Sequence, residues 1–243
     1  MKKIKGLLDH IFIDGLSGMA QGLFATLIIG TIIQQIGTLI GGPRGDMIFA
    51  VGKVAAALTG AGIGVGVAAK FKESYLVVVS AATAGMVGAF ASKLLAGTVL
   101  VDGTMVFAGP GEPLGAFLAA YIGIECGHLV AGKTKVDILV TPIVTIGTGS
   151  LVGLLVGPGV SKIMTSLGAM INWGVEQQPF LMGIVVSVLM GMILTLPISS
   201  AALGIILNLS GLAAGAATVG CCCNMVGFAV ASYRENKIGG LVA

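Results

Sequence analysis

Residues 201–233 read AALGIILNLSGLAAGAATVGCCCNMVGFAVASY and contain no charged side chain, and residues 181–200 before them are also uncharged. A helix that crosses a bilayer needs about 20 consecutive apolar residues, whereas a helix in a soluble core has no reason to remain uncharged for so long. The bias extends over the whole chain, which is 56% hydrophobic and only 9% charged. The sequence therefore predicts a membrane protein.

The composition also predicts the fold class, an all-α bundle of transmembrane helices. The 243 residues can supply about seven to nine membrane segments. Glycine is abundant, at 40 residues, which favours helices that approach one another closely through small side chains. Gly60 with Gly64, and Gly62 with Gly66, have the four-residue spacing of such contacts. We expect a short cytoplasmic N-terminal segment, 1–15, followed by one membrane domain, 16–243.

Charged residues separate the apolar runs and predict the topology. We expect the first two spans at 16–40 and 54–69, and the loop at 97–112 has no basic residue. Lysines recur instead in every second loop: Lys70, Lys72, Lys133 and Lys135. Basic residues mark cytoplasmic loops, so we expect the N-terminus and both lysine loops on the cytoplasmic side. The formal net charge of +3 reflects this topology, and no nucleic-acid partner is expected.

Prolines and polar residues predict breaks in the later helices. The segments ILVTPI, 138–143, and ILTLPI, 193–198, resemble each other, and each has a proline inside an apolar run. Such a proline frees backbone carbonyl groups, and broken helices in corresponding places point to the binding site of a transporter. We also expect a broken or re-entrant helix hairpin near 198–232, with its break at 208–211.

Glu125 and His128 are three residues apart on one face of the span expected at 113–131. Ionisable groups inside a bilayer are costly, so the pair indicates a functional polar site. The alternative is that both side chains lie near the cytoplasmic end of the helix and reach the lipid headgroups. The residues alone leave the two readings evenly balanced.

Glu176, Gln177 and Gln178 form the densest polar cluster between two apolar runs. A carboxylate beside two amides is suited to bind sugar hydroxyl groups, and Trp173 offers a flat face for a sugar ring. The alternative is a solvated turn with an interfacial tryptophan, which the residues alone favour.

Asn224, Ser199 and Ser200 are polar residues within the uncharged C-terminal region. They could hold neighbouring helices together or contact a polar substrate. We interpret the adjacent cysteines 221–223 as small packing residues. No spacing of metal ligands and no catalytic motif is present, so we expect no metal, no cofactor and no self-contained catalytic centre.

Five segments carry a resemblance to a known family: VDILVTPI (136–143), QPFLMG (178–183), LTLPISSAA (194–202), SGLAAGAATVGCC (210–222) and GFAVASYREN (227–236). They resemble the membrane IIC components of the bacterial sugar phosphotransferase system, in the stand-alone type without fused IIA or IIB domains. The members of this type are longer at the C-terminus.

The resemblance implies a multi-pass permease of the bacterial plasma membrane that binds a sugar. Partner phosphocarrier proteins of the IIA and IIB type would pass phosphate from phosphoenolpyruvate to the sugar, so the chain would take part in phosphotransfer only together with them. It also implies a homodimer within the lipid bilayer. Two alternatives stay open: a transporter or channel for another small polar solute without phosphate coupling, and a membrane sensor or assembly subunit that transports nothing.

Overall fold

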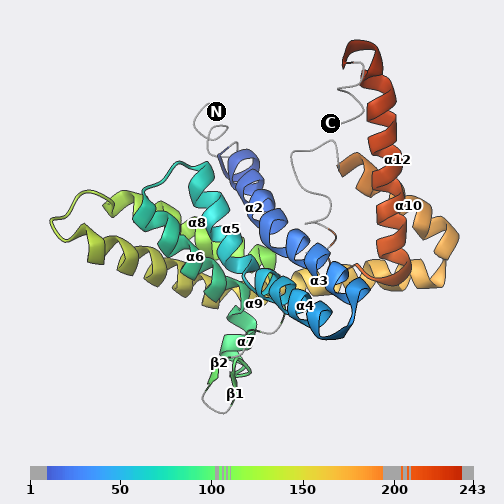
Figure 1. Cartoon of the computed structure of the whole chain (residues 1–243). Helices are drawn as coiled ribbons and strands as arrows, with labels where there is room; N and C mark the ends of the chain where they lie inside the picture. The colour runs from blue at the N-terminus through green and yellow to red at the C-terminus, as the bar shows by residue number, and fades with distance from the viewer. Residues whose placement is uncertain are drawn as a thin grey trace. The chain divides into compact units, whose positions relative to one another are not determined.

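A computed structural model describes residues 10–101, 104, 105, 107, 109, 111–193, 204, 207 and 209–236. The described residues form helices almost throughout, apart from two antiparallel strands of two residues each, which confirms the all-α prediction (Figure 1). The elements are two π-helical segments, His10–Gly15 and Phe24–Ile28, and α2 Leu16–Leu23, α3 Ile29–Ile40, α4 Gly42–Ala57, α5 Thr59–Lys70, α6 Tyr75–Ala89, α7 Ala91–Leu95, β1 Leu100–Val101, β2 Thr104–Met105, α8 Pro113–Val130, α9 Asp137–Gln177, α10 Pro179–Ile193 and α12 Gly211–Asn236.

Four stretches of helix in the described part of the chain are long and apolar enough to cross a membrane: Ile13–Ile40, Pro113–Val130, Asp137–Gln177 and Gly211–Ala231. The pair α4 and α5 meets the same requirement if it is one bent span, and α6 and α10 are shorter apolar helices. These seven apolar segments lie at the lower end of the expected range.

The chain divides into two compact units, Met1–Lys162 and Ile163–Ala243. Helix α9 begins in the first unit and ends in the second. The division into an N-terminal segment 1–15 and a membrane domain 16–243 stays a prediction.

Glycine contacts hold the first unit together on both faces of α5. Gly62 and Gly66 pack against α2, and a Cβ atom at Gly62 would lie 2.9 Å from the carbonyl oxygen of Gly22. Gly60 and Gly64 pack against α6, and a Cβ atom at Gly60 would lie 2.8 Å from a backbone oxygen of that helix. The predicted role of the two glycine pairs in close helix packing is therefore confirmed.

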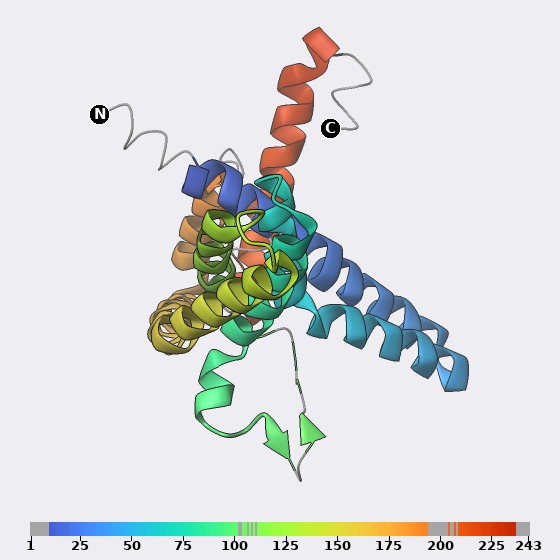
Figure 2. The ribbon, with the colours of Figure 1, turned by 90° about the vertical axis from the view of Figure 1, so that its left-hand side faces the viewer.

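Helix α4 was not expected, because its first half contains Pro43, Arg44 and Asp46 between glycines. Instead of one span at 54–69, the chain forms α4 and α5, which meet at Leu58 with a bend of 52°. Proline fits here because it lies in the first turn of the helix, where its missing N–H group would have no partner. Figure 2 shows α3 and α4 side by side, extending away from the other helices of this unit.

The sidedness of the loops follows from the antiparallel packing of α6 and α8. A Cβ atom at Gly88 would lie 2.5 Å from that of Ala119, and one at Gly127 would lie 3.3 Å from the side chain of Val77. The start of α6 therefore lies beside the end of α8, so both lysine loops are at the same end of the unit. This placement confirms the prediction that the two lysine loops lie on the same side. That this side faces the cytoplasm stays a prediction.

Helix α9 is continuous through Pro142, so the predicted break at this residue is wrong. The proline removes one backbone donor, but close packing against α8 holds the helix together around it. Thr141 and Thr145 are fully buried, and a Cβ atom at Gly123 of α8 would lie 2.7 Å from the Thr145 carbonyl oxygen. The corresponding proline of the second segment, Pro197, lies outside the described residues.

The second unit consists of the end of α9 with α10 and α12. Its core residues are Val175, Val186, Met190, Ala213 and Ala217. Gly220 of α12 lies against the backbone of Ser187, and four residues later Asn224 reaches Gly191, so α10 and α12 run parallel. Helix α12 begins at Gly211, whose φ is 52°, which agrees with the break expected at 208–211. Most of the first arm of the expected hairpin lies outside the described residues.

Candidate functional site

Glu125 lies in the last turns of α8 and binds the N-terminal helical segment. Its Oε1 atom is 3.3 Å from Nε2 of His10, and Tyr121 lies one helical turn earlier on the same face of α8. The His10 ring stacks on Phe71 with 4.0 Å between centroids, and Tyr121 meets Phe71 edge-on. Glu125 is thus the centre of a contact that joins three segments of the first unit.

His128 turns to a different partner, although it shares a helix face with Glu125. Its Nδ1 atom lies 2.9 Å from Oε1 of Glu73, in the turn between α5 and α6. The Glu73 side chain is mostly buried, whereas the His128 side chain is 65% exposed. The structure therefore places Glu125 and His128 in two separate contacts that fasten α8 to neighbouring segments. Their predicted role in substrate binding stays a prediction.

Glu176 and Gln177 lie exposed at the end of α9, and Gln178 follows in the short break before α10. Trp173 precedes Glu176 by three residues and Gln177 by four, so the three side chains share one face of the helix. The indole is 63% exposed, while the neighbouring Val175 is 1% exposed and anchors this turn in the core. The carboxylate, the amide and the aromatic face are therefore presented together.

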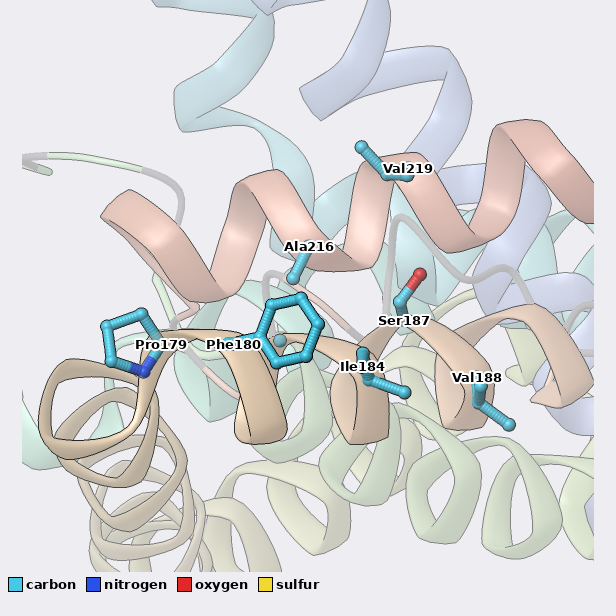
Figure 3. Close-up of a pocket in the computed structure, with 8 residues that line it drawn as sticks. Pro179, Phe180, Ile184, Ser187, Val188, Ala216 and Val219 are labelled. Carbon is cyan, nitrogen blue, oxygen red and sulfur yellow. The ribbon is translucent and has the colours of Figure 1, made fainter.

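A groove of about 360 Å³ between α10 and α12 begins directly after this polar cluster. Figure 3 shows its lining side chains, with the Phe180 ring and the Ala216 methyl group facing one another. The lining residues are Pro179, Phe180, Gly183, Ile184, Ser187, Val188, Ala216 and Val219. Ser187 supplies the one hydroxyl group of this lining, so the groove suits apolar groups better than a sugar.

Asn224 connects the two parallel helices of the second unit. Its Nδ2 atom donates a hydrogen bond of 2.7 Å to the carbonyl oxygen of Gly191. Of the three adjacent cysteines, Cys221 packs against the core of this unit, whereas Cys222 and Cys223 are exposed. The packing interpretation therefore fits Cys221 alone. Ser199 and Ser200 lie outside the described residues.

Glu112 is an ionisable group that the sequence alone does not single out. It precedes α8, its Oε2 atom accepts a hydrogen bond of 3.4 Å from Ser161, and its Oε1 atom is buried without a partner among the described residues. Burial raises the pKa of Glu112, against the opposing effect of the Ser161 hydroxyl. An acidic residue before a proline resembles an ordinary helix start, so its burial had no signal in the sequence.

Metal binding requires several ligands in one place. Among the described residues, no three His, Cys, Asp or Glu side chains come together to hold a metal ion. The candidate site residues are carboxylates, amides and imidazoles that take part in hydrogen bonds or are exposed.

The family model described as Phosphotransferase system, EIIC matches residues 13–243. The chain belongs to this family. No curated protein and no solved structure matches it. The resemblance seen in the five sequence segments is confirmed, and it extends over almost all of the chain.

Membership of the EIIC family identifies a multi-pass membrane protein that is the permease component of a sugar phosphotransferase system. It implies a sugar as the substrate, and IIA and IIB proteins as the phosphotransfer partners. The apolar helices agree with this identification.

Proposed function

We propose that this EIIC chain binds a sugar and moves it across the bacterial plasma membrane while IIA and IIB proteins transfer phosphate to it from phosphoenolpyruvate. The family match over residues 13–243 carries the proposal. The chain itself would bind, orient and release the sugar, and the phosphocarrier proteins would supply the reacting group.

The exposed face at the end of α9 is the best candidate for contacts with the sugar. Glu176 can accept hydrogen bonds from two sugar hydroxyl groups, and Gln177 and Gln178 can both donate and accept. Trp173 offers the apolar surface against which the C–H face of a sugar ring packs. Support comes from the helix geometry, which puts the indole and the carboxylate on one face.

The other predicted site residues are weaker candidates for contacts with the sugar. Ser199 and Ser200, which lie outside the described residues, would contribute hydroxyl groups. Asn224 already bonds to Gly191, and Glu125 and His128 already bond to His10 and Glu73. A sugar at any of these three residues would have to compete with an internal contact.

The orientation and the assembly are part of the same proposal. The N-terminus would be cytoplasmic, because the lysine loops and the N-terminal segment lie at one end of the first unit. The chain would form a homodimer, as the family resemblance implies.

Sugar phosphorylation by membranes tests the proposed function. Membranes that contain the chain, supplied with phosphoenolpyruvate and soluble phosphocarrier proteins, should phosphorylate at least one radiolabelled sugar of a panel of hexoses, pentoses and their polyols. Membranes without the chain are the control. Uptake of a sugar that stays unphosphorylated would refute the coupled mechanism.

A substitution tests the proposed site. Glu176→Gln keeps the size of the side chain and removes the charge, so a sugar hydroxyl would lose a charge-assisted hydrogen bond of roughly 1.5 to 3 kcal/mol, or about 10- to 150-fold in affinity. Asp46→Asn is the matched control, because Asp46 is also exposed and lies in the other unit. Equal sugar affinity in both folded variants would return Glu176 to the role of a solvated turn residue.

A further inference from the structure

Four exposed lysines lie together at one end of the first unit, and we call them the lysine rim: Lys70, Lys72, Lys133 and Lys135. Two come from the end of α5 and the turn after it, and two from the loop between α8 and α9. The contact between His128 and Glu73 holds these two segments beside each other. In Figure 2, the loop between α8 and α9 faces the viewer.

The acidic residues of these two segments are engaged in other contacts. Glu73 binds His128, and Oδ1 of Asp137 accepts hydrogen bonds from the Gly132 amide at 2.9 Å and the Thr141 hydroxyl at 2.6 Å. Within the described part of the chain, none of the four lysines forms an ion pair. The rim therefore presents concentrated positive charge.

Exposed apolar side chains lie within three or four residues of the rim lysines along the chain. Tyr75 at the start of α6 is 91% exposed, Leu129 at the end of α8 is 65% exposed and Ile138 at the start of α9 is 70% exposed. Lysine side chains can lay their apolar stems along such a surface and keep the ammonium group in water. Tyrosine is favoured at the same depth, where a membrane meets water. Charge next to exposed apolar surface fits a lipid surface better than the surface of a soluble acidic protein.

We propose that the lysine rim binds the phosphate headgroups of anionic lipids and fixes this end of the first unit at the membrane surface. The ammonium groups are flexible point charges that suit mobile headgroups, and they lack the planar fork with which arginine binds one fixed anion. The cytoplasmic leaflet carries the anionic lipids that attract such basic segments. Lipid binding by the rim does not require sugar transport or phosphotransfer.

The test uses the full chain, purified in a mild detergent and titrated with phosphatidylglycerol, with bound lipid counted by native mass spectrometry. A parallel titration uses phosphatidylcholine. Each lysine near an anionic surface contributes about 1 kcal/mol, so removing the two lysines of one loop should weaken phosphatidylglycerol binding by about 10- to 30-fold. The variants are Lys70→Gln with Lys72→Gln, and Lys133→Gln with Lys135→Gln.

Lys53→Gln with Lys162→Gln is the matched control, because it removes the same charge from exposed residues outside the rim. It should bind phosphatidylglycerol like the unmodified chain, and Lys→Arg at the rim should keep most of the binding. A second measurement needs no variant: phosphatidylglycerol binding by the unmodified chain should weaken as the salt concentration rises from 0.1 to 0.5 M.

Three results would overturn the proposal. The first is equal phosphatidylglycerol binding by the rim variants and the unmodified chain, and the second is equal weakening in the control variant. The third is unchanged lipid binding combined with weaker binding of a IIA or IIB protein, which would assign the rim to an acidic protein surface.

Discussion

The substitution Gly64→Ala tests the close packing of α5 against α6. A Cβ atom at Gly64 would overlap the carbonyl oxygen of Ala81 and lie 2.6 Å from its carbonyl carbon and 3.0 Å from the amide nitrogen of Ala82. Ordinary contacts between carbon atoms are about 3.5 to 4.0 Å, so the helices would have to separate by roughly 1 Å. No side-chain rotation can relieve the overlap, because all three atoms belong to the backbone.

The expected cost follows from two opposing effects. Overpacking of a tight interface costs roughly 1 to 3 kcal/mol, and a rigid backbone overlap belongs at the upper end of this range. Alanine regains about 1 kcal/mol over glycine in a helix, so we expect a net destabilisation of about 2 kcal/mol. Gly147→Ala in α9 is the matched control. Nothing lies within 4 Å of the Cβ position at Gly147, so this substitution should stabilise the folded chain by up to about 1 kcal/mol.

Thermal unfolding of the detergent-purified variants, followed by circular dichroism, measures the difference. A separation of about 3 kcal/mol corresponds to roughly 6 to 12 °C for a chain of this size. Equal melting temperatures for Gly64→Ala and Gly147→Ala would refute the close approach of α5 and α6 at this position.

Two further predictions concern charge and topology. Glu112→Gln should raise the melting temperature most at neutral pH, because the pKa of Glu112 is raised by burial and the native chain loses stability as the pH rises from about 4.5 through that raised pKa. Melting curves between pH 4 and 8 measure this, and a benefit that is largest at pH 4 would contradict it. In a background without native cysteines, a membrane-impermeant thiol reagent applied to intact cells should label Thr98→Cys and miss Lys72→Cys and Lys135→Cys. Labelling of either lysine position would overturn the cytoplasmic assignment.

Local patterns in the sequence were sufficient to predict several features of the fold. The uncharged C-terminal run predicted membrane helices, because charge in a bilayer is costly. The spacing of Gly60, Gly62, Gly64 and Gly66 predicted two close helix contacts, since residues four apart share a helix face. The alternation of lysine loops predicted which loops lie together.

Other features depend on packing between distant segments and had no local signal. Helix α4 forms although its first half is polar, because α3 packs along it through Gly37 and Gly45. Helix α9 passes Pro142 because its neighbours support it. Glu125 is 115 residues away from its partner His10, and His128 is 55 residues away from Glu73, so no spacing in one sequence could connect them.

The proposed coupling of sugar passage to phosphate transfer by this EIIC chain can be measured directly in membrane vesicles. Right-side-out membrane vesicles can be loaded with phosphoenolpyruvate, labelled with ³²P, and the soluble phosphocarrier proteins, and then given an external sugar. Sugar recovered from the vesicle interior should carry ³²P, and vesicles without the chain should accumulate none. Accumulation of sugar without ³²P would rule out this coupling and identify an uncoupled transporter.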